Sequence, residues 1–456
     1  MTNPTDTTPP ASGAMQKFAA DYLAKTREFS RNANLYVLHV IGMDMIHGSF
    51  NVLFNLYLLA LGFDIRFIGL RLMIGFIASA VTAVPAGLVS DRIGRKASFL
   101  LGDGVGAVIA LVMISTRNES VLLAGPALAA FFNNLHHTSE AAFMMENSRP
   151  GERVHLFSVS GSFRTFSAMA GALAAGLIPA LFIDDVGKVT AYRFAAYAGL
   201  SLWFLSLIPA LMLRSVEAEE QPEKDFSRAA KQRRGVRNLF SGIKHPRRIG
   251  YFVLTSAILA LGTAAVVPLL NVVFHEGPVH AEEGEIGVVF ALGELGLAIA
   301  TLGVPLLAAR MLKVDAIVLT RLMAIPFVLA MGFLPLLLNE GGLLLVVVGA
   351  SYIGRVTIFR VSGPLDDAFN MEVLDAKERA TSTGLEMAVA GAVSAVAILV
   401  GSRLMDSGDF TTPFIILAAA YLGSTLIYRR VFRPLELEEA QSSPAPEPAV
   451  SPAVAN

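Results

Sequence analysis

The sequence predicts an all-α integral membrane protein with about twelve transmembrane helices, for three reasons. Of its 456 residues, 54% are hydrophobic and 16% are charged, and the mean hydropathy is +0.59. Soluble chains carry about 25% charged residues. Long apolar runs also recur along the whole chain, each near the roughly 20 residues that cross about 30 Å of hydrocarbon. Finally, the two halves of the chain share a short motif.

Twelve apolar runs follow one another, each about 18 to 27 residues long. They lie at 36–61, 67–90, 98–115, 121–146, 156–182, 192–213, 250–274, 286–309, 315–338, 342–364, 382–404 and 411–430. A polar segment with cationic clusters separates the sixth run from the seventh. We therefore expect one six-helix bundle at 35–213, a cytoplasmic linker at 214–248 and a second six-helix bundle at 249–432.

The ends of the chain are polar and rich in proline, so we expect residues 1–34 and 433–456 to be disordered. Residues 1–34 lack the basic-apolar-small pattern of a signal peptide, so we expect the first run to serve as its own targeting signal. About 26 of the 36 Lys and Arg residues lie at the ends, in the linker and in the even-numbered connections, against about five in the odd-numbered ones. This bias predicts a multi-pass protein of the inner (plasma) membrane with both termini in the cytoplasm.

Several function classes find no support in the sequence. The chain has no cysteine, which excludes disulfides, thiolate catalysis and cysteine metal sites. It has no Walker-type phosphate loop, so ATP is not the expected energy source. The net charge of -1 gives no reason to expect a nucleic-acid partner. We expect no enzymatic activity, no cofactor, no metal and a monomer.

The shared motif indicates that the two halves are related. Residues 142–153 and 368–379 align without a gap and match at Ala, Phe, Met, Glu, Glu and Arg. Each segment lies at the cytoplasmic end of the fourth expected helix of its half. Internal repeats of this kind are common in secondary transporters.

A charged motif between the second and third runs is the most specific signal. It reads Gly87-Leu-Val-Ser-Asp91-Arg92-Ile-Gly94-Arg95-Lys96. An ordinary positive-inside loop would explain the cations but not the two glycines or the aspartate. The motif resembles the loop between the second and third helices of the major facilitator superfamily of transporters. The resemblance implies two six-helix bundles, a cavity lined by the first, fourth, seventh and tenth helices, and a cytoplasmic gate formed by Gly87, Asp91, Arg92, Gly94, Arg95 and Lys96.

The same resemblance implies how the gate and the helix contacts work. Asp91 would lie near the start of the eleventh helix and accept from the N-terminal amides at 381–383. Small-residue stripes would let helices slide past each other. They are Gly75, Ser79, Ala83 and Gly87 in the second helix, Gly384, Ala388, Ala392 and Ala395 in the eleventh, Gly161, Ala168, Ala172 and Ala175 in the fifth, and Gly293, Gly296, Ala300 and Gly303 in the eighth. Static packing would explain them equally well.

Charged residues inside the apolar runs are the strongest site candidates, since each costs at least about 2.5 kcal/mol at a helix centre. They include Asp44, Glu140, Arg164, Glu294, Arg355 and Glu386. At about 1.5 Å per residue, all but Glu294 fall into one layer on the cytoplasmic side of the midplane. Structural ion pairing is the alternative explanation, and Glu140 with Arg164 is the obvious pair.

Polar side chains also recur at helical spacing. Asp44, His47 and Asn51 share one face of the first helix, and Asn133, His137 and Glu140 share one face of the fourth. On the resemblance, Asn271, Tyr352 and Arg355 would complete the cavity lining. A divalent-cation site formed by His47, His136, Asp44 and Glu140 is a further alternative.

These observations predict a secondary active transporter that works by alternating access. We expect proton-coupled efflux of a small organic compound, with Asp44 and Glu140 as proton carriers and Arg164 and Arg355 as anchors for an anionic group. The resembling antiporters carry a proline motif in the fifth helix, but residues 161–176 contain no proline, which weakens the drug-antiporter assignment. The alternatives are proton-coupled uptake of a carboxylate or sugar, a lipid flippase, a transporter-like sensor and a divalent-cation transporter.

Overall fold

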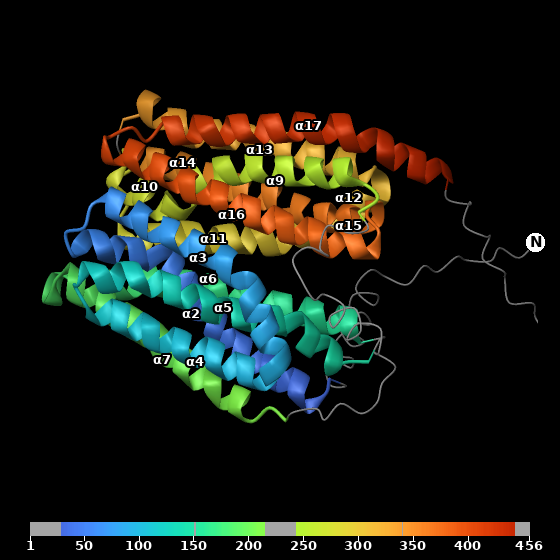
Figure 1. The fold of residues 1–456 in the computed structure, drawn as a ribbon. Helices are drawn as coiled ribbons and strands as arrows, with labels where there is room; N and C mark the ends of the chain where they lie inside the picture. The colour runs from blue at the N-terminus through green and yellow to red at the C-terminus, as the bar shows by residue number, and fades with distance from the viewer. Residues whose placement is uncertain (1–28, 150–151, 215–242, 340, 443–456) are drawn as a thin grey trace, which may run out of the picture.

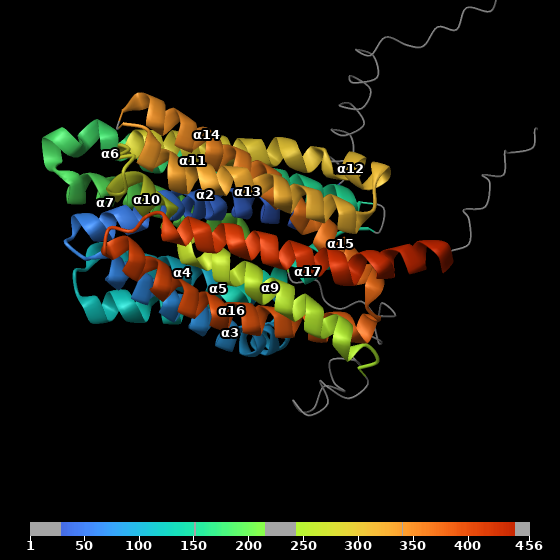
Figure 2. The ribbon, with the colours of Figure 1, turned by 90° about the horizontal axis from the view of Figure 1, so that it is seen from above.

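The computed structural model describes residues 29–149, 152–214, 243–339 and 341–442. Within these ranges the regular structure is entirely helical, as expected. The long helices run roughly side by side in two groups, the first from blue to green and the second from yellow to red (Figures 1 and 2). The two groups are the two halves of the chain.

The N-terminal half consists of α2 (Arg31–Ala60), α3 (Ile65–Ile93), α4 (Arg95–Ser115), α5 (Glu119–Glu146), α6 (Arg153–Val186) and α7 (Lys188–Leu211). The C-terminal half consists of α9 (Pro246–Val266), η2 (Val267–Leu269), α10 (Leu270–Glu276), α11 (Glu283–Leu302), α12 (Val304–Arg310), α13 (Lys313–Leu337), α14 (Gly342–Arg360), α15 (Ser362–Val373), α16 (Ala376–Asp406) and α17 (Thr412–Ser442). We call the side on which α2 begins and α17 ends the terminal side, and the other side the far side.

The two halves have the same internal arrangement. In the first, α2 packs on α6 and α7, while α4 packs on α5 and α7 and α3 packs on α5. In the second, α9 packs on α16 and α17, while α13 packs on α14 and α17 and α11 packs on α14. The halves meet through two equivalent pairs, α3 with α16 and α6 with α11. The expected pairing of the second with the eleventh helix is therefore present.

Eleven helices of the described chain are long and apolar enough to cross a membrane. The long helix missing from that group is α5, although it has 28 residues. Its second half carries Asn133, Asn134, His136, His137 and Glu140, which lower its hydropathy. The polar residues that make α5 the exception are also the ones that make it a candidate for function.

Several element boundaries differ from the sequence prediction. The seventh expected helix is divided into α9, η2 and α10, because Pro268 in η2 has no N–H to continue the α-helical bonding. Residues 433–442, which we expected in a disordered tail, form the end of α17. There the Glu436 carboxylate accepts hydrogen bonds from the backbone N–H groups of Lys313 and Val314, at 2.7 and 2.9 Å. This contact ties the end of α17 to the first turn of α13.

The charged motif between the second and third helices is almost entirely helical rather than a loop. Only Gly94 separates α3 from α4, and its φ of 84° lies in the region that glycine tolerates and other residues avoid. Its place in the motif is explained by this one-residue turn.

The glycines of the small-residue stripes do not face the helices that we expected. In α3, Gly75 faces Pro126 and Gly87 faces Thr138, both on α5, while a Cβ atom at Gly391 of α16 would lie 2.9 Å from the Ala80 Cβ atom of α3. In α11, Gly293 and Gly296 face α14 rather than α6. At Gly161 in α6, a Cβ atom would meet nothing within 4 Å. Ala172 of the α6 stripe does lie against α11, because a Cβ atom at Gly287 would lie 2.9 Å from its carbonyl oxygen.

The contact of α6 with α11 instead depends on Gly176 and Gly287 near the far side. A Cβ atom at Gly176 would lie 2.4 Å from the Glu283 carbonyl oxygen and 2.9 Å from Gly287 Cα, so no larger side chain fits without a backbone shift. Polar contacts between the halves gather on the same side. Tyr192 donates to Glu283 at 2.6 Å, and Arg66 pairs with Asp406 at 2.6 Å.

Candidate functional site

An ion cluster joins three helices of the N-terminal half. Arg164 on α6 donates from Nε to Asp44 Oδ2 on α2 at 3.0 Å, and its Nη1 donates to Glu140 Oε1 on α5. The three side chains are partly exposed, at 25% for Arg164, 14% for Asp44 and 13% for Glu140. The structure thus brings together three of the residues that the sequence placed in one layer. The cluster includes the Glu140–Arg164 ion pair, which we named as the obvious pair if these charges have a purely structural role.

Two histidines flank this cluster and remain more open. His47 Nδ1 lies 3.9 Å from Asp44, and His137 Nδ1 lies 3.7 Å from Glu140. Their side chains are 38% and 44% exposed. Asn51 and Asn133 on the same two helices are also exposed. The predicted polar faces of α2 and α5 therefore meet at the ion cluster.

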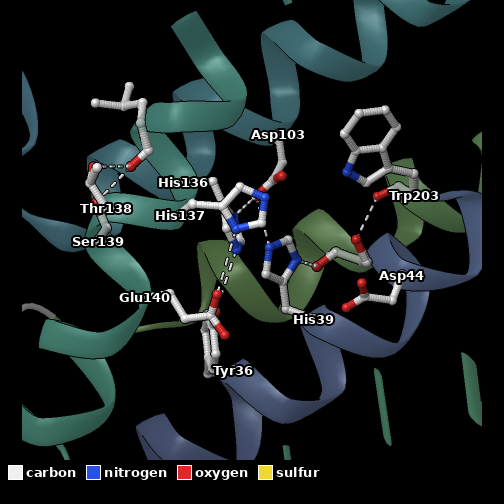
Figure 3. A network of polar contacts seen from close by, with 12 residues as sticks. Tyr36, His39, Asp44, Asp103, His136, His137, Thr138, Ser139, Glu140 and Trp203 are labelled. Carbon is white, nitrogen blue, oxygen red and sulfur yellow. Dashed lines mark hydrogen bonds and ion pairs between the residues drawn. The ribbon is translucent and has the colours of Figure 1, made fainter. Parts of the chain in front are cut away.

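A second polar network lies deeper in the same half and is almost sealed (Figure 3). His39 on α2 and His136 on α5 converge on a single oxygen, Oδ2 of Asp103 on α4, at 2.9 and 2.7 Å. The three residues are 0%, 1% and 3% exposed. His136 Nε2 also lies 3.4 Å from the Tyr36 hydroxyl. We call His39, Asp103 and His136 the buried triad.

The hydrogen bonds of the buried triad require one proton more than neutral histidines and an ionised aspartate supply. The Nδ1 atom of His39 lies 2.8 Å from the Ser206 carbonyl oxygen, which can only accept, so Nδ1 carries a hydrogen. If His39 were neutral, its Nε2 would be an acceptor facing another acceptor, Asp103 Oδ2. A proton between those two atoms resolves the conflict. The triad is therefore arranged to hold a proton out of contact with water.

Sequence reasoning missed the triad as a unit. His136 was singled out for the alternative cation site, but His39 was not, because it lies on a different face of α2 from Asp44. The signal that could have found it is the same one: a polar side chain inside an apolar run. Only the contact of α2, α4 and α5 shows that the three belong together.

The predicted divalent-cation set is not assembled in the described residues. His47, His136, Asp44 and Glu140 form no common group, whereas His39, Asp103 and His136 do, as do His136, His137 and Glu140. Ligands about 2.1 Å from a tetrahedral ion would lie roughly 3.4 Å apart. The shorter distances in the triad are those of hydrogen bonds.

The candidates of the C-terminal half are separate from these networks. Arg355 is 6% exposed and donates to the Tyr421 hydroxyl at 2.9 Å, not to Asp44, Glu140 or Glu386. Glu386 instead accepts from Ser256 and Ser382, each at 2.8 Å, and from Asn370 at 3.2 Å. The expected single layer of opposite charges thus does not form one network.

The remaining candidates occupy two different places. Tyr352 stacks on Phe290, with ring centroids 4.8 Å apart, and Glu294 is partly buried nearby on α11. Asn271 lies on the far side, where it accepts from Asn55 at 3.0 Å and donates to the Val52 carbonyl oxygen at 2.8 Å. Asn271 therefore joins the two halves.

The motif at the end of α3 forms a chain of charges on the terminal side. Arg95 donates to Asp91 at 3.0 Å and lies 3.4 Å from Glu146 on α5, while Arg92 and Lys96 are exposed or partly exposed. In the other half, Lys313 and Glu372 form the equivalent pair at 2.5 Å. The expected partners of Asp91 at residues 381–383 are not the start of a helix, because α16 begins at Ala376.

Comparisons with known proteins agree with this architecture. A family model described as Major Facilitator Superfamily matches residues 35–362. A multidrug resistance protein, MdtG of Serratia proteamaculans (strain 568), is 26% identical over 219 residues, which are 46% of this chain and 48% of that protein. The match thus spans about half of each chain.

Two solved structures have a similar fold. The nucleoside transporter NupG superposes with a TM-score of 0.67 at 14% identity, covering 89% of this chain and 99% of the other. A bacterial homologue of the iron transporter ferroportin, in an inward-facing state, gives a TM-score of 0.68 at 14% identity, covering 88% and 98%. At 14% identity, these similarities show a shared fold and give no information about the substrate.

Proposed function

This chain belongs to the major facilitator superfamily and is a membrane transporter, and we propose that it exports a small organic compound in exchange for protons. The observation that carries the proposal is the buried triad. A site that needs an added proton to complete its hydrogen bonds, and that is closed to water in this conformation, suits a coupling ion that is bound on one side and released on the other.

The ion cluster is the proposed link between proton and substrate. Asp44 and Glu140 share the guanidinium of Arg164. Protonation of either carboxylate would weaken the ion pair between that carboxylate and Arg164, and a charged group of the substrate would weaken the pairs in the same way. The cluster joins α2, α5 and α6, and the triad joins α2, α4 and α5. A change in either network would therefore move the same two helices.

The proposed cycle starts from a conformation closed on the far side. Three contacts hold the halves together there: the Tyr192–Glu283 and Asn55–Asn271 hydrogen bonds and the close approach of Gly176 to Gly287. On the terminal side, the carboxylate of Asp91 is 57% exposed and bonds to Arg95 of its own half. We propose that Asp91, with Gly87, Arg92, Gly94, Arg95 and Lys96, engages α16 only when the terminal side closes.

Export is favoured over uptake by one comparison. The relative that matches half of this chain is named a multidrug resistance protein. With cytoplasmic termini, a conformation open on the terminal side would load substrate from the cell. Proton-coupled uptake of a carboxylate or sugar would use the same states in the other direction.

Transport by the purified protein in proteoliposomes with an imposed pH gradient tests the proposal. Cationic dyes, neutral sugars and organic anions form the substrate panel, and a trapped pH dye reports proton movement. We expect Asp103→Asn to abolish gradient-driven accumulation and proton movement, because the introduced amide cannot carry the shared proton, while exchange without a gradient continues.

The matched control is Glu119→Gln, which removes an exposed carboxylate at the far-side start of α5 and should behave as wild type. Unchanged proton movement in Asp103→Asn would contradict the role of the triad. Loss of exchange without a gradient, together with loss of folded protein, would show that Asp103 acts only in stability. If transport required added zinc or iron, the result would favour a metal ion rather than a proton in the triad.

A further inference from the structure

A cavity of about 290 Å³ lies inside the N-terminal half. It is bounded by α2, α3, α4, α5 and α7, where α2 faces the layer formed by α3, α4 and α5. His47 and Asn133 line it and are themselves exposed, so they mark its connection to solvent. Its volume is near the lower end of the range for small-molecule sites.

Arg71 on α3 lines this cavity without a partner for its charge. Its guanidinium carbon lies 4.3 Å from the centre of the Phe54 ring, which covers one face. Its Nε–H is buried and has no acceptor among the described residues, and none of their carboxylates forms an ion pair with it. A charge within a membrane span is costly, so an unpaired guanidinium there is expected to serve a ligand.

Trp203 on α7 supplies a second unpaired donor on the same cavity. It is 9% exposed, and its indole Nε1–H has no acceptor in the described part of the chain. Buried donors are normally satisfied, so two unsatisfied donors that line one cavity point to a missing acceptor.

The walls define the shape and polarity of the ligand. A Cβ atom at Gly106 would lie 3.2 Å from the Trp203 ring, so the absence of a side chain there lets the flat indole form a wall. Phe50, Met113 and Pro126 add apolar surface. Asp103 also borders the cavity, but His39 and His136 bind its carboxylate and offset its charge.

We propose that this cavity binds a small aromatic carboxylate, with the carboxylate on Arg71 and the ring against Trp203. A guanidinium binds a carboxylate through two parallel hydrogen bonds, which suits an acceptor-rich anion. The site lies within one half and is separate from the ion cluster. It goes beyond the proposed function because it does not depend on proton coupling or on the direction of transport.

The chain offers a direct probe, because Trp203 is its only tryptophan. Benzoate is titrated into the purified full-length protein in detergent, and tryptophan emission and calorimetric heat are recorded. We expect saturable changes in both signals. Benzamide, which has the same shape without the charge, should bind much more weakly.

Variants of Arg71 test the anchor. Arg71→Gln should weaken benzoate binding by about tenfold or more and leave benzamide unchanged, since a charge-assisted hydrogen bond is lost. Arg71→Lys keeps the charge but loses the planar fork, so it should bind benzoate less well than wild type and better than Arg71→Gln. The Arg71→Lys variant tests the anchor even if Arg71→Gln does not fold. Arg117→Gln, an exposed far-side arginine, is the matched control and should bind as wild type.

Equal benzoate affinity in wild type, Arg71→Lys and Arg71→Gln would overturn the proposal. So would the absence of any signal in the wild type up to about 10 mM benzoate, or equal binding of benzamide. Because no pH gradient is present, a failure of proton coupling would not alter these results.

Discussion

Arg164 is the residue on which the ion cluster depends, because one guanidinium contacts carboxylates from two other helices. Its removal would leave Asp44 and Glu140 as neighbouring negative charges in a partly buried setting. The cost of an uncompensated charge is larger than the net contribution of the intact pair. At this scale, the atoms that stabilise the N-terminal half are also those to which we assign the coupling of proton and substrate.

We predict that Arg164→Gln lowers the free energy of unfolding by about 3 kcal/mol. The apparent melting temperature of the purified protein measures the change. Adding Asp44→Asn should restore much of the loss, since it removes one of the two unpaired charges. Arg149→Gln is the control, because the Arg149 side chain is 86% exposed, and it should change stability by less than about 0.5 kcal/mol. Equal melting temperatures for the two single variants would refute the prediction.

At the scale of helices, the crossing of α6 and α11 decides how closely the halves approach on the far side. We predict that Gly176→Ala opens this side, because a methyl group would meet backbone atoms of α11 at less than 3 Å. Gly161→Ala on the same helix should be neutral, since nothing lies within 4 Å of its new Cβ atom.

Accessibility of a single cysteine at Leu177 measures the opening, because the native chain has no cysteine and this side chain is 48% exposed near the crossing. A thiol reagent added from the far side should react faster in the Gly176→Ala background than in the Gly161→Ala background. Identical rates would mean that the close approach at Gly176 does not control closure.

A buried carboxylate of α16, that of Glu378, binds the start of α9. Glu378 accepts hydrogen bonds from the backbone N–H groups of Lys244 and His245, at 2.5 and 2.8 Å, and its side chain is 2% exposed. Burial alone would raise the pKa of this carboxyl, but the hydrogen bonds from His245 and Lys244 lower the pKa from its usual 4.5 to about 2. The ionised form is therefore the one that stabilises the fold.

Because the pKa is lower in the folded protein, this stabilisation is present above about pH 4.5 and is lost as the pH falls toward 2. We predict that Glu378→Gln lowers the free energy of unfolding by about 1–3 kcal/mol at pH 7. The difference from wild type should shrink between pH 4.5 and pH 3, as measured by apparent melting temperatures. A difference that stayed constant across this range would show that the charge of Glu378 contributes little.

For the whole molecule, the distribution of Lys and Arg predicts cytoplasmic termini, and the structure provides exposed positions that test this orientation. Arg117 follows α4 on the far side, and Arg149 follows α5 on the terminal side. In whole cells, Arg117→Cys should react with a membrane-impermeant thiol reagent, whereas Arg149→Cys should react only after the membrane is opened. The opposite result would reverse the orientation and, with it, the proposed direction of loading.

Much of the architecture was predictable because membrane helices are specified by local properties. An apolar run of about 20 residues must form its backbone hydrogen bonds internally and so becomes a helix. The ends of the helices were harder to predict. The helix α17 continues through charged residues to Ser442, and its Glu436 accepts a hydrogen bond from α13, which is distant in the sequence. The expected helix at 250–274 also breaks at Pro268, which the hydropathy pattern does not register.

The sequence by itself determined the fold class, the two related halves, the family and the polar faces of α2 and α5, because spacing along one helix decides which side chains share a face. Only the tertiary structure decided which faces meet. It joined Asp44 and Glu140 through Arg164, separated Arg355 from them, and assembled His39, Asp103 and His136 from three helices. The rotation of each helix about its axis follows from packing against several neighbours at once, and no single segment of the chain encodes it.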